Sequence, residues 1–291
     1  MHSAPRAHWA GRWIRPAVVI VALSVAAAAA AFAGVPEPPY NWSYDGLLDS
    51  GTGTSVAAAG DVNGDGFSDV VIGGPGNSQN GIDAGRIDVF FGGPGGLTHH
   101  RAKTGTQAGA KFGMVVSSAG DINGDGYDEI LVASPDYGNG HTREGKVELY
   151  LGGPGGIADS PSWTVESGQT DAAFGLSVAG IGDVNGDGLD DVAVGAPRYD
   201  NGSTDEGRVF VYYGAHNGLS TTASVVRESN TAGAWFGACV AWGGDLNGDG
   251  FDDMVVGMPR WSNGQSGEGA ACVYLGSANG LGALPIWLDE S

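Results

Sequence analysis

Four acidic segments of the chain have the residue types and spacing of metal-binding loops. Each reads Asp-x-Asn-Gly-Asp-Gly and carries a further carboxylate at position nine, so that side-chain oxygens recur along the loop. The backbone carbonyl of position seven adds another donor. The donors at positions one, three, five, seven and nine are Asp61, Asn63, Asp65, Phe67 and Asp69; Asp121, Asn123, Asp125, Tyr127 and Glu129; Asp183, Asn185, Asp187, Leu189 and Asp191; and Asp245, Asn247, Asp249, Phe251 and Asp253. Oxygen donors at alternate positions suit Ca²⁺, whereas Mg²⁺ demands a stricter octahedron and Zn²⁺ prefers His or Cys. The sequence predicts up to four bound Ca²⁺ ions.

A helical EF-hand and a plain turn are the alternatives to a calcium loop within a β-hairpin. An EF-hand needs a bidentate Glu at position twelve, and apolar residues stand there instead: Ile72, Val132, Val194 and Val256. Asn-Gly and Asp-Gly also form turns without metal, but four copies in one register favour the calcium loop. Without the bidentate Glu, we expect affinities of about 10⁻⁴ to 10⁻³ M. In the second copy, Asp128 could replace Glu129 as the closing ligand.

The four loops belong to an internal repeat. Their first aspartates are 60, 62 and 62 residues apart. A Phe-Gly pair precedes three of the loops, at 112–113, 174–175 and 236–237, whereas the first copy has Thr52-Gly53. An apolar run ending in proline follows each loop, and a further strand-like segment comes next, at 86–91, 146–151, 208–213 and 270–275. A period of this length indicates a repeat architecture.

Each repeat is predicted to form a blade of β-strands. Short β-branched or aromatic stretches alternate with Gly, Asn, Asp and Pro clusters, and no helical period appears. A fourth strand is expected at 163–166, 225–228 and 286–289. Tandem four-stranded antiparallel units are typical of a β-propeller, and a linear β-solenoid is the alternative. We therefore expect an all-β chain whose repeats span 49–107, 108–169, 170–231 and 232–291.

These four blades are not expected to close a ring by themselves. The lead-in segment, residues 34–48, holds Tyr40 to Tyr44 at the place of an outer strand from another blade. The last repeat already has an outer strand of its own, so the lead-in strand needs inner strands from elsewhere. The sequence predicts an incomplete propeller, completed by a longer gene product or by another molecule. A self-closed four-bladed ring with a spare strand is the alternative.

The N-terminal residues have the features of a secretory signal peptide. Three arginines precede an apolar run at 17–33, which ends in the small-x-small sequence Ala31-Phe32-Ala33. We expect residues 1–33 to be cleaved, which would leave a secreted or cell-surface protein without a membrane span. An uncleaved anchor helix is the alternative, because 17 residues reach the lower limit of a span.

Composition and cysteine usage argue against a nucleic-acid partner and against a disulfide. The net charge of −20 would repel phosphate backbones, so we expect no nucleic-acid partner. With 42% hydrophobic and only 16% charged residues, the chain can form a core. The two cysteines, Cys239 and Cys272, are expected in strands separated by another strand, too far apart for a disulfide. We expect two buried thiols.

The repeat resembles the FG-GAP repeat of integrin α-subunit N-terminal propellers and of related bacterial exported proteins. The residues that carry the resemblance are Phe174-Gly175 and Gly195-Ala196-Pro197, with Gly73-Gly74-Pro75, Ala133-Ser134-Pro135 and Gly257-Met258-Pro259 in the other copies. The resemblance implies a seven-bladed ring closed by an N-terminal strand. It also implies calcium in the hairpin loops of one face and ligand-binding loops on the opposite face. The chain departs from the family in showing four repeats and in lacking the first Phe.

No catalytic constellation is found in the sequence, and the histidines at 99, 100, 141 and 216 are expected in solvated loops. We expect a noncatalytic, calcium-binding adhesion or recognition module for protein or glycan ligands. The loops after the prolines would face away from the calcium loops, and their candidate ligand contacts are Tyr137, Arg198, Tyr199 and Trp261, because aromatic and Arg side chains dominate binding hot spots. Solvent-facing turns or packing between blades is the alternative for each.

Two further features of the sequence concern modification and a second function class. Asn41-Trp42-Ser43 and Asn201-Gly202-Ser203 match the N-glycosylation pattern, which matters only if the host glycosylates exported proteins. The alternative function is that of an ancillary propeller in a longer secreted hydrolase, phospholipase-like, whose catalytic domain lies elsewhere.

Overall fold

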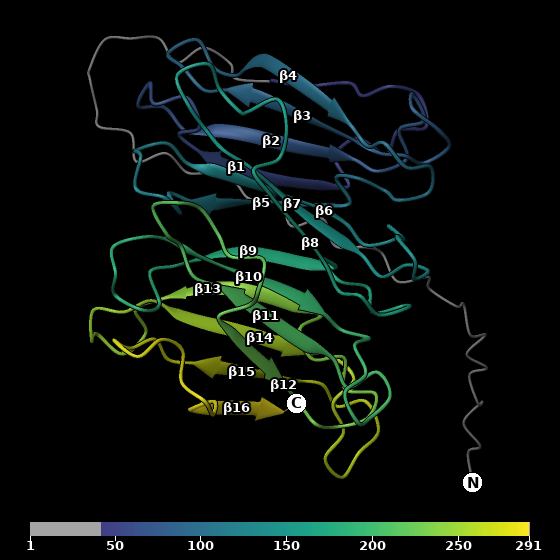
Figure 1. Cartoon of the computed structure of the whole chain (residues 1–291), viewed down its shortest axis with the longest axis vertical. Helices are drawn as coiled ribbons and strands as arrows, with labels where there is room; N and C mark the ends of the chain where they lie inside the picture. The colour runs from purple at the N-terminus through teal and green to yellow at the C-terminus, as the bar shows by residue number, and fades with distance from the viewer. Residues whose placement is uncertain (1–41, 291) are drawn as a thin grey trace, which may run out of the picture. The chain divides into compact units, whose positions relative to one another are not determined.

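The chain folds into four antiparallel sheets of four strands each, with no helix among the residues described (Figure 1). The structure is a computed structural model, and it describes residues 42–290. The predicted signal peptide and residues 34–41 of the lead-in segment lie outside this range. The four sheets confirm the all-β prediction and match the four predicted blades.

Within each sheet the strands follow one another in sequence order. The first two sheets contain β1 (Ser55–Gly60), β2 (Asp69–Gly74), β3 (Arg86–Phe91) and β4 (Thr98–Thr104), then β5 (Val115–Gly120), β6 (Glu129–Ser134), β7 (Lys146–Tyr150) and β8 (Trp163–Glu166). The last two contain β9 (Ser177–Gly182), β10 (Asp191–Ala196), β11 (Arg208–Tyr212) and β12 (Val225–Glu228), then β13 (Cys239–Gly244), β14 (Asp253–Met258), β15 (Ala270–Tyr274) and β16 (Trp287–Glu290).

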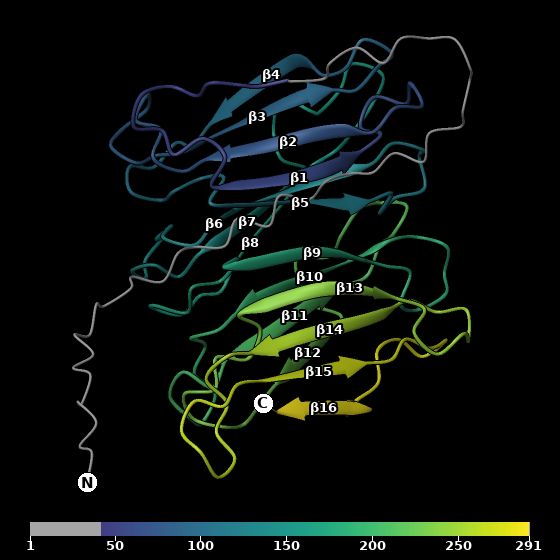
Figure 2. The same ribbon diagram turned by 180° about the vertical axis from the view of Figure 1, so that it is seen from behind.

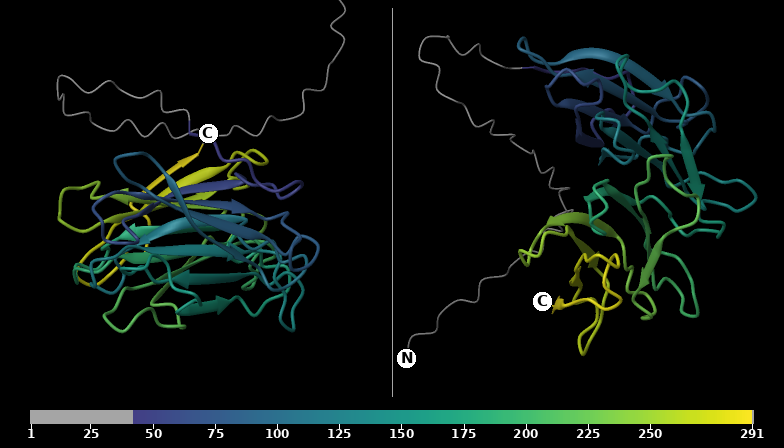
Figure 3. Two further views of the ribbon diagram at one scale, coloured as in Figure 1. Left: turned by 90° about the horizontal axis from the view of Figure 1, so that it is seen from above. Right: turned by 60° about the vertical axis from the view of Figure 1, so that its left-hand side comes forward.

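Successive sheets pack face to face through apolar side chains. The first strands of neighbouring sheets lie next to one another, β1 beside β5, β5 beside β9 and β9 beside β13 (Figures 2 and 3). Between the first two sheets, for example, Val71 and Ile87 pack in one cluster with Ile130 and Val132. Two more such clusters fill the following interfaces. The core therefore lies between the sheets, as blades of a propeller require.

Each first strand ends in a glycine at a β-bulge that leads into an acidic loop. The register shifts beside these glycines, which have φ values of 75°, 73°, 70° and 68° at Gly60, Gly120, Gly182 and Gly244. Residues other than glycine rarely adopt this left-handed backbone conformation, so glycine is favoured there. A Cβ at Gly182 would also lie 2.1 Å from Asp252 Oδ2 of the next sheet. The bulge thus sets the direction of each loop, and its glycine leaves room for the following sheet.

An aspartate at loop position eight joins each sheet to the one before it. Asp128 Oδ2 accepts the backbone N–H of Asp61 at 2.6 Å. Asp190 and Asp252 bond in the same way to the first residues of the second and third loops. Asp128 therefore points to the preceding sheet, and the idea that it replaces Glu129 in its own loop is wrong.

The first repeat lacks two groups that the later repeats use to contact the preceding sheet. It has Ser68 at position eight, and it has Thr52 where Phe112, Phe174 and Phe236 stand. Those three phenylalanines are buried, and the Phe112 N–H donates to the Ala84 carbonyl of the first sheet at 3.1 Å. Both departures of the first repeat thus affect the same function, contact with a preceding sheet, and no sheet among residues 42–290 lies on that side of the first one.

The end of the lead-in segment covers the first sheet, although residues 42–48 form no strand. The Trp42 ring lies 4.9 Å from the Phe90 ring at 79°. Trp163 of β8 contacts Tyr212 of the next sheet almost identically, at 4.8 Å and 77°. Phe90 and Tyr212 occupy the same position in β3 and β11. Trp42 therefore takes the place of an outer-strand residue, while the lead-in strand itself stays a prediction.

Three expectations about single residues are wrong. His99 and His100 lie in β4, where His99 contacts Asp88 at 2.9 Å and His100 stacks on Phe91. Cys239 is exposed, because no sheet among residues 42–290 covers its side of the fourth sheet, whereas Cys272 is buried. Both thiols are free, as predicted, with β14 between their strands.

Candidate metal-binding loops

All four acidic loops connect the first and second strands of a sheet. Because consecutive strands are antiparallel, the loops between second and third strands lie at the opposite end of each sheet. The structure thus separates the candidate metal loops from the loops that hold Tyr137, Arg198, Tyr199 and Trp261, which is the arrangement that the sequence predicts.

The position-one carboxylate organises each loop. Asp61 Oδ1 accepts the N–H groups of Gly64 and Asp65 at 2.7 and 3.0 Å, and Oδ2 accepts that of Gly66 at 2.8 Å. The same three bonds recur at Asp121, Asp183 and Asp245. Gly64 and Gly66 have φ values of 73° and 87°, which let the loop curl around the carboxylate.

The side-chain oxygens at positions three and five also accept backbone N–H groups of the same loop. Asn63 Oδ1 accepts the Asp65 N–H, and Asp65 Oδ1 accepts the N–H of Phe67, both at 2.9 Å. Asn63 Nδ2 donates to Asp65 Oδ2 at 3.0 Å. In the second loop, Asn123 Nδ2 lies 3.4 Å from Glu129 Oε1. Positions three, five and nine are therefore neighbours.

The carboxylate at position nine is fully buried in every loop. The four side chains are those of Asp69, Glu129, Asp191 and Asp253. The Asp191 oxygens accept the N–H groups of Val184 at 3.0 Å and Gly214 at 2.8 Å. Asp69 and Asp253 make the equivalent pair of bonds. Position nine therefore ties its loop to the turn that follows the third strand.

The electrostatics of the loops favour a bound cation. Burial raises the pKa of Glu129 to about 8 and that of Asp191 to about 7, and it also raises the pKa of Asp69. By contrast, the Gly250 N–H and its neighbours hold the pKa of the exposed Asp245 below its usual range. A bound cation would lower these raised pKa values by stabilising the ionised carboxylates.

The donor set fits a hard cation. In the described part of the chain, no three His, Cys, Asp or Glu side chains form a metal site on their own. Each loop instead combines carboxylates with an Asn amide and a backbone carbonyl, and all its donors are oxygens, which Ca²⁺ prefers. Positions one, three, five, seven and nine would hold the ion. The bound ion would supply the positive charge that the crowded carboxylates lack.

The raised pKa values predict how the metal-free chain responds to pH. Glu129 and Asp191 bind protons more tightly in the folded chain than in the unfolded chain. Their contribution to stability is therefore present at low pH and is lost as pH rises through about 7 to 8. We expect the melting temperature of chelator-treated protein to fall between pH 5 and pH 9, because ionisation of these two buried carboxylates destabilises the folded chain. Glu129→Gln, which cannot ionise, should flatten this fall, and a melting temperature that rises instead would contradict the burial argument.

The four candidate ligand contacts on the opposite end are half-buried and engaged within the chain. Lys146 Nζ lies 4.4 Å from the Tyr137 ring centre, and the Arg208 guanidinium lies 4.3 Å from that of Tyr199. Arg198 stacks over Trp235, and Trp261 packs into the apolar cluster of the last two sheets. Their role in ligand binding stays a prediction.

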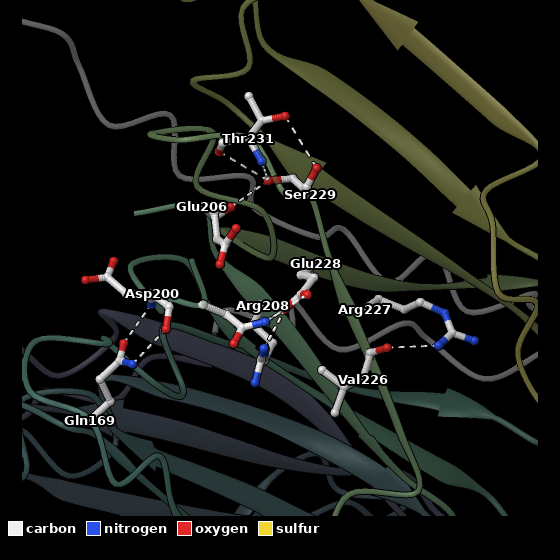
Figure 4. A network of polar contacts seen from close by, with 10 residues as sticks. Gln169, Asp200, Glu206, Arg208, Val226, Arg227, Glu228, Ser229 and Thr231 are labelled. Carbon is white, nitrogen blue, oxygen red and sulfur yellow. Dashed lines mark hydrogen bonds and ion pairs between the residues drawn. The ribbon is translucent and has the colours of Figure 1, made fainter. Parts of the chain in front are cut away.

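Polar contacts hold the loop that carries Arg198 and Tyr199. In Figure 4, the Gln169 side chain bonds the backbone of Asp200 twice, at 2.9 and 2.7 Å, and Arg208 pairs with Glu228. Gln107 makes the equivalent two bonds to Gly138. These loops are therefore fixed between repeats, and sequence reasoning missed both glutamines because their contacts are long-range.

Comparison with known proteins agrees with the repeat. A family model described as the FG-GAP repeat matches residues 52–90, 112–150, 174–212 and 236–274, more than half of the chain. The chain is 34% identical to integrin alpha-PS2 of Drosophila melanogaster over 222 residues, 72% of this chain and 15% of that protein. It is 32% identical to integrin alpha-8 of Gallus gallus over 254 residues, 83% of this chain and 22% of that protein. The chain thus spans about a fifth of the length of such relatives.

Solved structures show only a distant likeness. A rhamnogalacturonan lyase, YesW, is matched with a TM-score of 0.34 and 13% identity, over 84% of this chain and 52% of that one. The lyase from Bacillus licheniformis gives a TM-score of 0.35 at the same identity, with the same shares covered. Similarity at this level carries no argument about activity.

Proposed function

Because this chain belongs to the FG-GAP repeat family, we propose that it is an exported, noncatalytic recognition module whose four acidic loops bind Ca²⁺. Its ligands would be proteins or glycans, bound outside the cytoplasm. Among residues 42–290, no helix is long and apolar enough to cross a membrane.

The observation that carries the calcium proposal is the fourfold identity of the loops. Each folds around its first aspartate with the same three backbone bonds, and each buries its ninth-position carboxylate. Backbone N–H groups hydrogen-bond each buried carboxylate, but no cationic side chain pairs with it among residues 42–290, and a buried charge is costly without a compensating charge. A bound cation would supply that charge, which turn formation alone does not.

The recognition part of the proposal rests on the similarity to integrin α-subunits and on the fixed loops at the opposite end. Those loops hold an aromatic ring at one register position in three repeats, Tyr137, Tyr199 and Trp261. Their separation from the acidic loops means that calcium would stabilise the module without contacting the ligand.

Addition of Ca²⁺ to chelator-treated protein tests the proposal. A ligand that binds only the folded chain raises its melting temperature. We expect a clear rise at about 10 mM Ca²⁺ and a smaller one at equal Mg²⁺, because Mg²⁺ dehydrates reluctantly and demands octahedral geometry. Calorimetry measures the melting temperature with each of the two ions. An unchanged melting temperature in Ca²⁺ would contradict the calcium assignment.

A further inference from the structure

A cavity of about 380 Å³ lies between the first two sheets. One wall is formed by β4 and the residues that follow it, and the other by β6, β7 and neighbouring loop residues. We call it the polar pocket and define it by Lys103 of the first sheet and by Ser134, Lys146, Glu148 and Tyr150 of the second. Its volume is within the range of small-molecule sites.

Two buried hydroxyl groups of the polar pocket have no hydrogen-bond partner in the described part of the chain. They belong to Ser134, which is 1% exposed, and to Tyr150, which is 5% exposed. Buried polar groups are nearly always hydrogen-bonded, because a buried group without a partner loses the bonds that water would give it. A ligand in the pocket would supply partners for both hydroxyls.

Lys103 contributes a cation that pairs with no carboxylate of residues 42–290. Its Nζ donates to the backbone carbonyl of Asp159 at 2.8 Å and lies 5.1 Å from the centre of the Tyr150 ring. Burial and the neighbouring Arg101 lower the pKa of Lys103. An anion bound in the pocket would stabilise the charged form of this side chain.

The other charged groups of the polar pocket form an ion pair. Lys146 Nζ lies 3.1 Å from Glu148 Oε1, and both side chains are nearly buried, at 13% and 12% exposure. An ammonium group can only donate and a carboxylate can only accept, whereas hydroxyl groups do both. The pocket therefore presents donors and acceptors together, with Lys103 as its uncompensated cation.

The same place between the second and third sheets is filled by apolar side chains. Lys103 pairs with Ile87 as Val165 pairs with Val147, so Lys103 and Val165 occupy one register position. Packing of successive sheets thus needs none of the polar groups at these positions, which leaves ligand binding to account for them. The apolar cluster of this second interface contains Val165, Ala196 and Phe210 where the pocket has Lys103, Ser134 and Glu148.

A cation recurs at the Lys103 position between the third and fourth sheets, but there it is bonded within the chain. The Arg227 guanidinium donates to the Leu281 and Gly282 carbonyls at 2.6 and 2.9 Å. Arg227 thus contributes to the packing of its own interface. Lys103 has N–H groups left for a ligand, because an ammonium group carries more donors than its bond to Asp159 uses.

The set of donors and acceptors distinguishes among anionic ligands. An acidic peptide side chain would pair with Lys103, but it offers no hydroxyl group to Glu148, whose like charge repels it. A sugar acid offers a carboxylate to Lys103 and hydroxyl groups that donate to Glu148 and accept from Lys146. A saccharide unit that carries a carboxylate therefore satisfies the whole set.

We propose that the polar pocket binds a carboxylate-bearing saccharide unit. Lys103 holds the carboxylate, and the four other side chains of the pocket hold the sugar hydroxyl groups. The inference rests on the recognition function stated above and names an acidic glycan as its ligand. Tyr137, one of the candidate ligand contacts, also lines this pocket.

Calorimetric titration of the full chain with D-glucuronate and with D-glucose tests the proposal, because the two sugars differ only in a carboxylate against a hydroxymethyl group. We expect glucuronate to bind about tenfold more tightly, since a hydrogen bond to a charged group contributes about that factor or more. Lys103→Met keeps the apolar stem and should remove this preference without changing glucose binding. Lys111→Met is the matched control. Lys111 pairs with Asp136 at 2.8 Å outside the pocket, so the preference should persist.

Ser134→Ala gives a second readout, and the third sheet already has alanine at this position, Ala196. The variant loses a bond to a sugar hydroxyl group, so it should weaken glucuronate and glucose about equally and leave the preference intact. The proposal is overturned by equal affinity of the wild type for both sugars, or by a preference that survives Lys103→Met. Tighter binding of triglutamate than of glucuronate would assign the pocket to an acidic peptide instead.

The calcium response of the same samples separates this proposal from the proposed function. The rise in melting temperature with Ca²⁺ depends on the acidic loops and not on the pocket. An intact rise without glucuronate binding would overturn the pocket assignment alone. Glucuronate binding without the rise would support the pocket and contradict the calcium loops.

Discussion

Replacing the first aspartate of all four loops by asparagine should abolish the rise in melting temperature that Ca²⁺ causes in the wild type. The variant is D61N/D121N/D183N/D245N. Asparagine keeps one of the two side-chain oxygens that accept loop N–H groups, so two of the three loop hydrogen bonds are retained while the charge and the bond from the Gly66 N–H are lost. For each ion bound with a Kd of about 10⁻⁴ to 10⁻³ M, about 10 mM Ca²⁺ contributes about 1.4 to 2.7 kcal/mol. Four ions should raise the wild-type melting temperature by more than about 10 °C.

The control for this variant removes the same number of charges elsewhere. Asp45, Asp49, Asp159 and Asp200 are exposed and lie outside the acidic loops. Their replacement by asparagine should leave the calcium response intact. If the fourfold loop variant still gains the full rise in calorimetry, the cation binds elsewhere and the loops are turns only.

Gly207→Ala should destabilise the chain far more than Gly269→Ala. The two glycines occupy the same register position and have similar φ values, 81° and 75°. Each substitution pays the strain of a left-handed residue, about 1 to 2 kcal/mol. Only Gly207 adds a clash, because its new Cβ would lie 2.3 Å from the Phe236 carbonyl oxygen and 2.4 Å from the Phe236 nitrogen. Such overpacking costs roughly another 1 to 3 kcal/mol.

Urea unfolding of both variants measures this difference in the free energy of unfolding. Gly207→Ala should fall below Gly269→Ala by the cost of the clash alone, since the backbone strain cancels in the comparison. Equal losses at the two positions would mean that the third and fourth sheets do not approach as closely as the structure shows. The blade packing would then need revision.

Local turn chemistry and periodicity were enough to predict most of the fold. The strands after each acidic loop and the third strands were found within a residue or so, because Asn-Gly, Asp-Gly and Pro mark their ends. β4, residues Thr98–Thr104, was missed because it carries histidines and cations rather than alternating apolar residues. Its contacts with β3, such as His99 with Asp88, are tertiary.

The features that depend on a neighbouring sheet could not be predicted from one repeat. Cys239 is exposed because no sheet among residues 42–290 covers its side of the fourth sheet, and its own strand does not reveal this. From the sequence, Asp128 is only an alternative to Glu129 within its own loop, yet its carboxylate accepts the Asp61 N–H, 67 residues away. The sequence holds one signal for this contact. The repeat that has Ser68 in place of the aspartate also lacks the phenylalanine, so the two residues are lost together.

Counting bound ions tests the central claim most directly. Equilibrium dialysis of the wild type against Ca²⁺ up to about 10 mM should saturate at one ion for each acidic loop, four in all. Asp183→Asn should bind one ion fewer, with the other sites unchanged. Absence of saturable binding in this range, or an unchanged count in the variant, would contradict the assignment of these loops as calcium sites.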